Sequence, residues 1–251
     1  MKIAVYLFMA MILPLVSFAA DNMQAIFAKA NAQYTKGQFK EAEAGYKQLV
    51  NGGYESAALY YNLGNAEYRL NDIASAMLYY EKAHKLSPGD EDINANIRFA
   101  NQKLADKIDT TPELFFVTWW HSFILSFSAN AMAVWSVVLL ILASAALTVY
   151  FFTYSVSVKK MSFYSALVTA VFAVVTIVYT TSQSSYFAGN KQAIIFNTVN
   201  VKGGPMESSS TLFVLHEGTK VNVQETGNGW LRIKIANGNQ GWVKAADAKT
   251  I

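Results

Sequence analysis

Three patterns of apolar and polar positions follow one another along the chain. Up to about residue 110, apolar residues recur at helical spacing with a 34-residue period, which pairs Ala30 with Gly64, Tyr34 with Tyr68, Ala42 with Ala76 and Tyr46 with Tyr80. Two long uncharged runs come next, and from residue 191 apolar and polar residues alternate between glycine-containing turns. These patterns are typical of a helical solenoid, of membrane spans and of short β-strands, respectively. We therefore predict a multidomain membrane protein with all-α helical repeats, a two-helix transmembrane hairpin and an all-β small barrel.

The repeat region is predicted over residues 21–110. Its second copy closely resembles the tetratricopeptide (TPR) consensus, through Leu63-Gly64-Asn65-Ala66, Ala76, Tyr80, Ala83 and Pro88. The first copy, with Gly37-Gln38-Phe39 and Ala42, matches it more loosely. Small residues such as Gly64 let paired helices approach closely, and Pro88-Gly89 ends the last repeat helix. A capping helix is predicted over residues 92–107, and because so short a stack is marginal we expect a partner or the membrane to complete it.

Repeats that resemble TPRs usually bind an extended segment of a partner along the concave face formed by their first helices. By that pattern the groove is lined by Asn31, Tyr34, Tyr61, Asn65 and Arg69. One interpretation has Asn65 and Arg69 hydrogen-bonding to the backbone or a carboxylate of the partner. The other is that Asn65 is only a common consensus residue and Arg69 a solvated charge.

The middle of the chain predicts a membrane hairpin. An aromatic helix over residues 113–127 carries Trp119 and Trp120, which favours the membrane interface, although it could instead pack into the last groove of the repeats. Uncharged spans are predicted over residues 132–152 and 162–182, joined by a tight connection of about ten residues that holds Lys159 and Lys160. Since neither span contains an ionisable residue, a transporter is not indicated.

The N-terminus predicts export. Lys2 precedes an uncharged run that ends in small residues, which is typical of a signal peptide over residues 1–19; an uncleaved anchor is the alternative. Export of the repeats and the positive-inside rule applied to Lys159 and Lys160 give the same orientation. We expect two spans in a bacterial inner (cytoplasmic) membrane, with both soluble domains on the periplasmic side.

Residues 191–251 predict the β-domain. The order Val199-Asn200-Val201-Lys202-x-x-Pro205, Leu215 to Val221, Gly229-Trp230 and Gly241-Trp242-Val243 resembles a bacterial SH3-like domain. Lys202 stands where arginine is usual, which puts a bidentate contact there in doubt. Trp230 and Trp242 could form a platform for a peptide or glycan, or they could pack in the core or rim of a small barrel.

Composition narrows the candidate chemistry. The net charge is +3, with lysines and arginines mostly scattered, so no basic patch indicates nucleic acid, and there is no cysteine for a thiol or thiolate metal site. His84, His121 and His216 lie in different segments and predict neither a metal cluster nor a catalytic triad. No catalytic residue, metal ligand or cofactor is predicted, and we expect that the chain is not an enzyme.

In this order, the signal, repeats, tryptophan segment, hairpin and SH3-like tail resemble the BatE family of the Bacteroidetes aerotolerance operon. The resemblance implies partners that include von Willebrand A-domain membrane proteins, another TPR protein and a MoxR-type ATPase, with a role in stress tolerance or envelope assembly. Two main hypotheses follow: a scaffold that gathers protein partners, and a cell-wall anchor whose SH3-like domain binds peptidoglycan. An enzyme subunit that uses the active site of a partner is a third.

Overall fold

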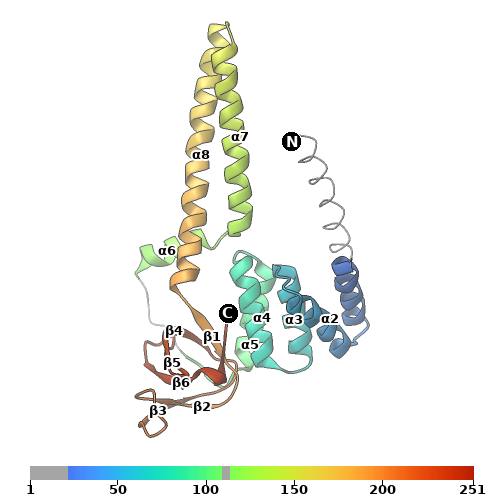
Figure 1. Ribbon diagram of the computed structural model, residues 1–251, viewed down its shortest axis with the longest axis vertical. Coiled ribbons are helices and arrows are strands. Elements are labelled where there is room, and N and C mark those ends of the chain that lie inside the picture. The colour runs from blue at the N-terminus through green and yellow to red at the C-terminus, as the bar shows by residue number, and fades with distance from the viewer. Residues whose placement is uncertain (1–21, 109–113) are drawn as a thin grey trace, which may run out of the picture.

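The computed structural model describes residues 22–108 and 114–251. A helical-repeat region and a C-terminal β-domain lie side by side at one end of a long helical hairpin (Figure 1). The predicted signal peptide lies outside the described residues. The architecture thus contains a helical-repeat region, two long apolar helices and an antiparallel sheet, in the predicted order.

Five helices build the repeat region. A first helix is described over residues 22–35, and it is followed by α2 (Phe39–Asn51), α3 (Ala57–Arg69), α4 (Ile73–Leu86) and α5 (Glu91–Lys103). The side chains of Ser56, Asp72 and Asp90 accept hydrogen bonds from backbone N–H groups at the start of α3, α4 and α5. These caps satisfy amides that have no partner within a helix, which is why each helix begins where it does.

Small residues set the distance between paired helices, as predicted. A Cβ atom added to Gly64 of α3 would lie 2.6 Å from Cδ1 of Tyr80 in α4. Tyr80 is itself 1% exposed, so its ring has no room to move away. The buried cluster between the first helix, α2 and α3 contains Ala30, Ala42, Tyr46, Leu49, Leu59, Leu63 and Ala66.

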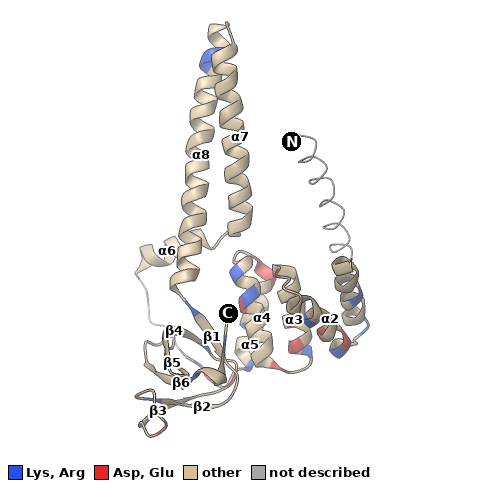
Figure 2. Ribbon diagram, in the orientation of Figure 1, with Lys and Arg blue, Asp and Glu red and all other residues tan. Residues whose placement is uncertain are grey.

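The hairpin consists of α7 (Ala129–Phe152) and α8 (Val156–Gly189), and both are long and apolar enough to cross a membrane. The 24 residues of α7 extend over about 36 Å, against roughly 30 Å of hydrocarbon. Residues 153–155 alone connect the two helices, so the expected ten-residue connection is wrong. Lys159 and Lys160 belong instead to the first turns of α8, at the end of the hairpin farthest from the two domains (Figure 2).

The two hairpin helices pack through small side chains. Ser136 and Ala143 of α7, and Ala166 and Ala173 of α8, are all less than 10% exposed. The neighbouring Ser165 is exposed, so Ala166 rather than Ser165 lies in the contact. The seven-residue spacing of the buried alanines keeps them on one side of α8 and lets the helices approach closely.

The β-domain is one antiparallel sheet with the strand order β3-β2-β6-β5-β4-β1-β7. Its elements are β1 (Gln192–Ile195), β2 (Val199–Lys202), β3 (Thr211–Leu215), β4 (Lys220–Gly227), β5 (Trp230–Lys234), β6 (Gln240–Lys244), the short helix η1 (Ala245–Asp247) and β7 (Ala248–Thr250). Asn228 and Gly229 join β4 to β5 with φ angles of 52° and 76°, the geometry that an Asn-Gly hairpin turn requires. Alternate residues of the strands fill a buried core that includes Ile195, Val201, Leu231 and Ile233.

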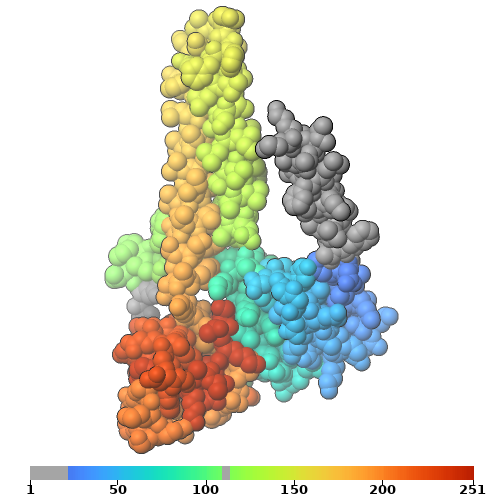
Figure 3. All heavy atoms as spheres, viewed as in Figure 1, coloured from blue at the N-terminus to red at the C-terminus, as the bar shows by residue number. Residues whose placement is uncertain are grey.

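The β-domain packs against the helical repeats, which the sequence did not indicate. Ile194 of β1 is fully buried in a cluster with residues of α4 and α5, among them Met77, Tyr80 and Ala100. Gly218 of the β-domain has a φ of 85°, which favours glycine, and a Cβ atom there would lie 2.4 Å from Cδ2 of Leu104, which follows α5. Figure 3 shows the last residues of the chain, in dark red, against the teal atoms of the repeats. The end of the short stack is thus covered by the chain's own β-domain, whereas we expected a partner or the membrane there.

Polar contacts fix the same interface. Lys220 of β4 donates to Glu81 of α4 across 2.7 Å, and Glu81 is only 3% exposed. Asp106, just after α5, accepts a hydrogen bond of 2.8 Å from the backbone N–H of His216 and one of 2.7 Å from the Thr219 hydroxyl. His216 Nδ1 lies 2.7 Å from the other carboxylate oxygen of Asp106. Three residues of the β-domain therefore converge on the two acidic side chains.

The segment between α6 and α7 also contacts the repeats. A Cβ atom on Gly89, in the turn between α4 and α5, would lie 2.0 Å from the carbonyl oxygen of Ser126. Ser126 follows α6 (Phe115–Ile124), the described form of the predicted aromatic helix. Gln183 of α8 donates to the carbonyl oxygens of Ile124 and Phe127, which ties the end of α6 to the hairpin.

Candidate binding surfaces

Two of the five predicted groove residues take part in a repeated hydrogen-bond motif. Oδ1 of Asn31 accepts hydrogen bonds from the Tyr46 hydroxyl (2.7 Å) and from Nδ2 of Asn62 (3.0 Å). One repeat later, Oδ1 of Asn65 accepts from the Tyr80 hydroxyl (2.8 Å) and from Nδ2 of Asn96 (2.8 Å). Each asparagine therefore joins three helices, so the consensus role of Asn65 is a structural one.

The amide nitrogens of Asn31 and Asn65 remain available for a ligand. Among the described residues, neither Nδ2 atom donates a hydrogen bond. Both side chains are half-buried rather than enclosed. An asparagine held through its oxygen presents its NH₂ group in a fixed direction, which suits recognition of a carbonyl or carboxylate oxygen.

Aromatic rings surround the other groove residues. The Arg69 guanidinium lies over the Phe39 ring, 4.5 Å from its centroid, and the same ring meets Tyr34 edge-on at 5.2 Å. The Tyr61 ring lies 6.2 Å from that of Tyr80. Arg69 is exposed, and stacking on Phe39 positions its guanidinium while leaving the hydrogen-bond donors for other contacts.

The sequence interpretation missed Asn62, Asn96 and Phe39, which position the groove residues. Asn62 and Asn96 are 34 residues apart, as are Tyr46 and Tyr80, so the period itself carried the signal for the motif. Phe39 had no such signal, because its contact with Arg69 depends on how α2 and α3 pack.

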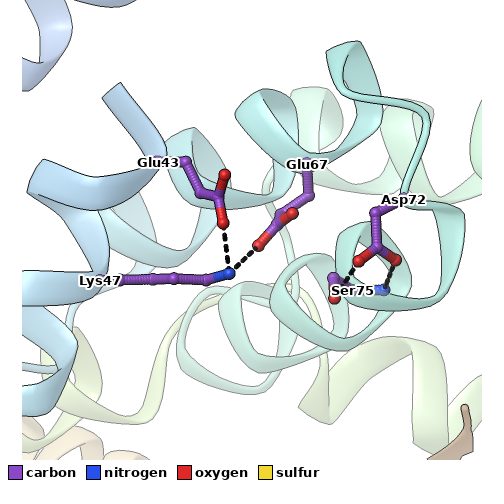
Figure 4. Close-up of polar contacts among 5 residues, drawn as sticks. All are labelled: Glu43, Lys47, Glu67, Asp72 and Ser75. Atoms are coloured by element: carbon purple, nitrogen blue, oxygen red, sulfur yellow. Dashed lines mark hydrogen bonds and ion pairs between the residues drawn. The ribbon is translucent and has the colours of Figure 1, made fainter. Parts of the chain in front are cut away.

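An ion pair with one buried carboxylate joins α2 to α3. Glu67 of α3 is 2% exposed, and the Lys47 ammonium of α2 lies 2.8 Å from its carboxylate and 2.5 Å from that of Glu43 (Figure 4). Burial raises the pKa of Glu67 above its ordinary value, although Lys47 acts in the opposite direction. Next to this pair, Asp72 caps α4 by accepting hydrogen bonds from the backbone and hydroxyl of Ser75 (Figure 4).

Trp230 and Trp242 lie on the outer face of the β-domain. Their strand neighbours Leu231 and Val243 point inward and are paired with each other, so the two tryptophans point outward. The buried core cluster contains neither, and both are half-buried. Packing in the core is therefore excluded for both.

The surroundings of the tryptophans are polar and charged. Arg232 stands opposite Trp242 and Lys244 stands opposite Trp230 in the register of β5 and β6. Trp230 also lines a pocket of about 220 Å³ together with Lys202, Lys244 and Glu207. An aromatic wall beside mixed charges suits a peptide or a glycan with amide and carboxylate groups.

The described residues bring together no group of three histidine, aspartate or glutamate side chains that could hold a metal ion. His84 lies in α4 and His216 at the interface between the domains. Burial lowers the pKa of His84, so this imidazole is neutral at physiological pH.

Comparisons with known families match both domains. The family model of the bacterial SH3 domain matches residues 197–249, and that of the tetratricopeptide repeat matches residues 57–90. No curated protein matches the chain. The second repeat copy and the β-domain are therefore similar to two families of binding modules that are typically not catalytic and that take proteins or peptidoglycan as partners.

Proposed function

We propose that this chain is a non-enzymatic, membrane-anchored adaptor that gathers partner proteins on one side of a membrane. The groove carries this proposal, because Asn31 and Asn65 each present an unused NH₂ group beside a stacked Arg69. An array of fixed donors along helical repeats is suited to an extended peptide whose backbone carbonyls or carboxylates accept hydrogen bonds.

The hairpin supplies the anchor in this proposal. The helices α7 and α8 would span a bacterial inner membrane, with Lys159 and Lys160 on the cytoplasmic side and both domains in the periplasm. The position of both domains at one end of the hairpin supports this orientation (Figure 2). The uncharged helix α6 would lie in the membrane interface, since Phe115 and Trp119 are 84% and 67% exposed.

The partners that we propose are those implied by the resemblance to the BatE family. They include von Willebrand A-domain membrane proteins and another TPR protein of an aerotolerance or envelope complex. The two matched modules support protein partners in general.

Partner capture from solubilised membranes tests the adaptor proposal. Asn65→Asp keeps an oxygen for Tyr80 and Asn96 but removes the free NH₂ group, and Arg69→Gln removes the stacked cation. We expect this double variant to lose partners that the wild-type chain retains. Lys40→Ala, on the exposed side of α2, is the matched control and should retain them. Recovery of the same partners by the double variant would contradict the proposal.

A second candidate function is peptidoglycan binding through the SH3-like domain. It is favoured by the outward position of Trp230 and Trp242 beside charged side chains. Sedimentation of the full chain in detergent with purified cell wall tests it. Trp230→Ala with Trp242→Ala should abolish sedimentation, while the groove variant should sediment normally. If the wild-type chain stays in solution, the SH3-like domain is not a wall anchor.

A further inference from the structure

The seam between the helical repeats and the β-domain is hollow along the last strand. One cleft, of about 590 Å³, lies between α4 and the segment formed by η1 and β7. A hollow of about 300 Å³ adjoins it, and Lys82 and Thr250 line both spaces. Neither space coincides with the groove of the repeats or with the tryptophan face. The seam is therefore a third surface, and it exists only because the two domains pack together.

Strand β7 leaves one edge of the sheet free. It is the last strand in the order of the sheet and pairs only with β1. The backbone N–H of Ile251 donates to Gln192, and that of Phe196 donates to Asp247, so the hydrogen-bonded pairs use residues 247, 249 and 251. In an antiparallel ladder the residues between them direct their N–H and C=O groups the other way.

Ala248 and Thr250 are those intervening residues, and both line the 590 Å³ cleft. Thr250 stands opposite Ala193 in a non-hydrogen-bonded pair, so its backbone N–H and C=O are directed away from β1. An exposed strand edge that carries unused donors and acceptors is a template for another extended chain.

The charge along the seam is positive. Lys47, Lys82 and Lys249 line the cleft, and Lys47 is already balanced by Glu43 and Glu67. Within the described residues, Lys82 and Lys249 form no ion pair and lie instead against the rings of Tyr60 (5.5 Å) and Phe196 (3.8 Å). The adjoining hollow has one acidic side chain in its described lining, that of Glu55. Two ammonium groups thus flank the free edge. Lys249 has no ion-pair partner among the described residues, and the nearby acidic charge that acts on Lys82 is that of Glu55 in the adjoining hollow.

We propose that the seam binds an extended acidic segment of a partner protein, which adds as a strand to the free edge of β7 and places carboxylates beside Lys82 and Lys249. The segment would pair with the backbone N–H and C=O of Thr250 and with the C=O of Ala248, because the N–H of Ala248 already donates to the Ala245 carbonyl. Side chains of an added strand alternate in direction, so acidic residues at every second position would all face α4 and its lysine. Burial lowers the pKa of Lys82, and a bound carboxylate would compensate the desolvation that causes this shift.

Fluorescence anisotropy with the full chain in nanodiscs of uncharged lipid tests the proposal. The probe is a labelled peptide of alternating threonine and glutamate. We expect it to bind, and we expect Lys82→Glu with Lys249→Glu to weaken binding by about tenfold, since each exposed ion pair contributes a modest amount and reversal adds repulsion. Lys234→Glu on β5 is the matched control and should leave affinity unchanged.

Two further arms separate strand addition from simple charge attraction. Thr250→Pro removes an outward N–H group that makes no hydrogen bond to β1, and it should also weaken binding. A probe with alternate N-methylated amides should not bind. Should the reversal variant unfold at a lower temperature than the wild type, Lys82→Gln with Lys249→Gln takes its place.

Several results would overturn the proposal: absence of binding, equal binding of a threonine–lysine peptide, or affinity that is unchanged in both the lysine and the Thr250 variants. Binding that is lost only in the Asn65→Asp and Arg69→Gln chain would place the peptide in the groove instead. That result would reject the seam and leave the adaptor proposal intact, so the two proposals fail separately.

Discussion

Lys47 contacts two carboxylates that differ in exposure, and removal of the Lys47 side chain would affect mainly Glu67. The Glu67 side chain is 3% exposed, so a charge left there without Lys47 would be poorly solvated. Glu43 is more exposed, at 20%, and would be solvated more readily. A single substitution of Lys47 would therefore destabilise the contact between α2 and α3.

We predict that Lys47→Ala destabilises the chain by about 1 to 3 kcal/mol, because it leaves the buried Glu67 carboxylate unpaired. Chemical denaturation of the full chain in detergent, followed by circular dichroism, measures the change. Lys47→Ala with Glu67→Gln should recover part of the loss. Lys40→Ala is the control for removal of an exposed lysine, and an equal effect of both single variants would contradict the prediction.

Asp106 should make the stability of the domain interface depend on pH. Partial burial by itself raises the pKa of Asp106, but hydrogen bonds from His216 and Thr219 outweigh it and hold the pKa below the ordinary value of 3.8. A carboxyl group with a lowered folded-state pKa contributes stability above its unfolded-state pKa and loses that contribution as the pH falls through the folded-state value.

We predict that Asp106→Asn lowers the free energy of unfolding by about 1 to 2 kcal/mol near neutral pH. The difference from wild type should shrink as the pH falls below about 4, where the wild-type carboxylate becomes protonated. Denaturation curves of both chains across this range provide the measurement. A difference that stays constant down to about pH 3 would show that the carboxylate charge contributes nothing.

Among the elements, α6 leaves most of its aromatic face uncovered. Its aromatic side chains include Phe115, Phe116, Trp119, Trp120 and Phe123, all at least 40% exposed. Its end is nevertheless fixed, because Gln183 binds two carbonyl oxygens there and the Tyr179 hydroxyl accepts a hydrogen bond from Phe127 N–H. An apolar helix held at the base of two apolar spans is suited to the interface of a bilayer.

We predict that Trp119 of α6 contacts lipid. In a chain that keeps Trp119 and has phenylalanine at the other four tryptophan positions, lipids brominated near the headgroup should quench the fluorescence strongly. A chain that keeps only Trp230 should be quenched by aqueous iodide instead, because this residue lies on the outer face of the β-domain. Equal quenching of both chains by iodide would contradict the interfacial position of α6.

The sequence predicted most elements because each depends on local patterns. The 34-residue period located the paired helices, the uncharged runs located α7 and α8, and the Asn-Gly turn located a β-hairpin. The length of the hairpin connection was wrong, since Lys159 and Lys160 extend α8 rather than interrupt it. A lysine is compatible with a helix, so charge alone could not mark where the helix begins.

At the scale of the whole molecule, contacts between distant segments could not be predicted. Asp106 and His216 are separated by 110 residues, and Glu81 and Lys220 by 139, with no periodicity that relates them. The groove residues were named from a family pattern, whereas the internal use of Asn31 and Asn65 oxygens depends on three packed helices. The cleft along β7 is formed by the packing of the two domains, so it could not be predicted from the sequence either.

The packing of both domains at one end of the hairpin is central to this account, because an adaptor must present its binding surfaces to the same compartment. Gly89 of the repeats meets Ser126 in the segment that leads into α7, and the β-domain meets the repeats through Lys220 and Asp106. Neither domain could lie on the opposite side of a membrane without breaking these contacts.

Cysteine labelling in intact spheroplasts tests whether both domains lie on the same side of the membrane. Each introduced cysteine can be read alone, because the chain has no cysteine of its own. The exposed sites are Glu41→Cys in the repeats, Thr226→Cys in the β-domain and Ser157→Cys at the far end of the hairpin. With a membrane-impermeant reagent, we predict labelling at the first two sites and none at the third until the membrane is permeabilised. Labelling of only one of the two domains, or of Ser157→Cys alone, would contradict the account.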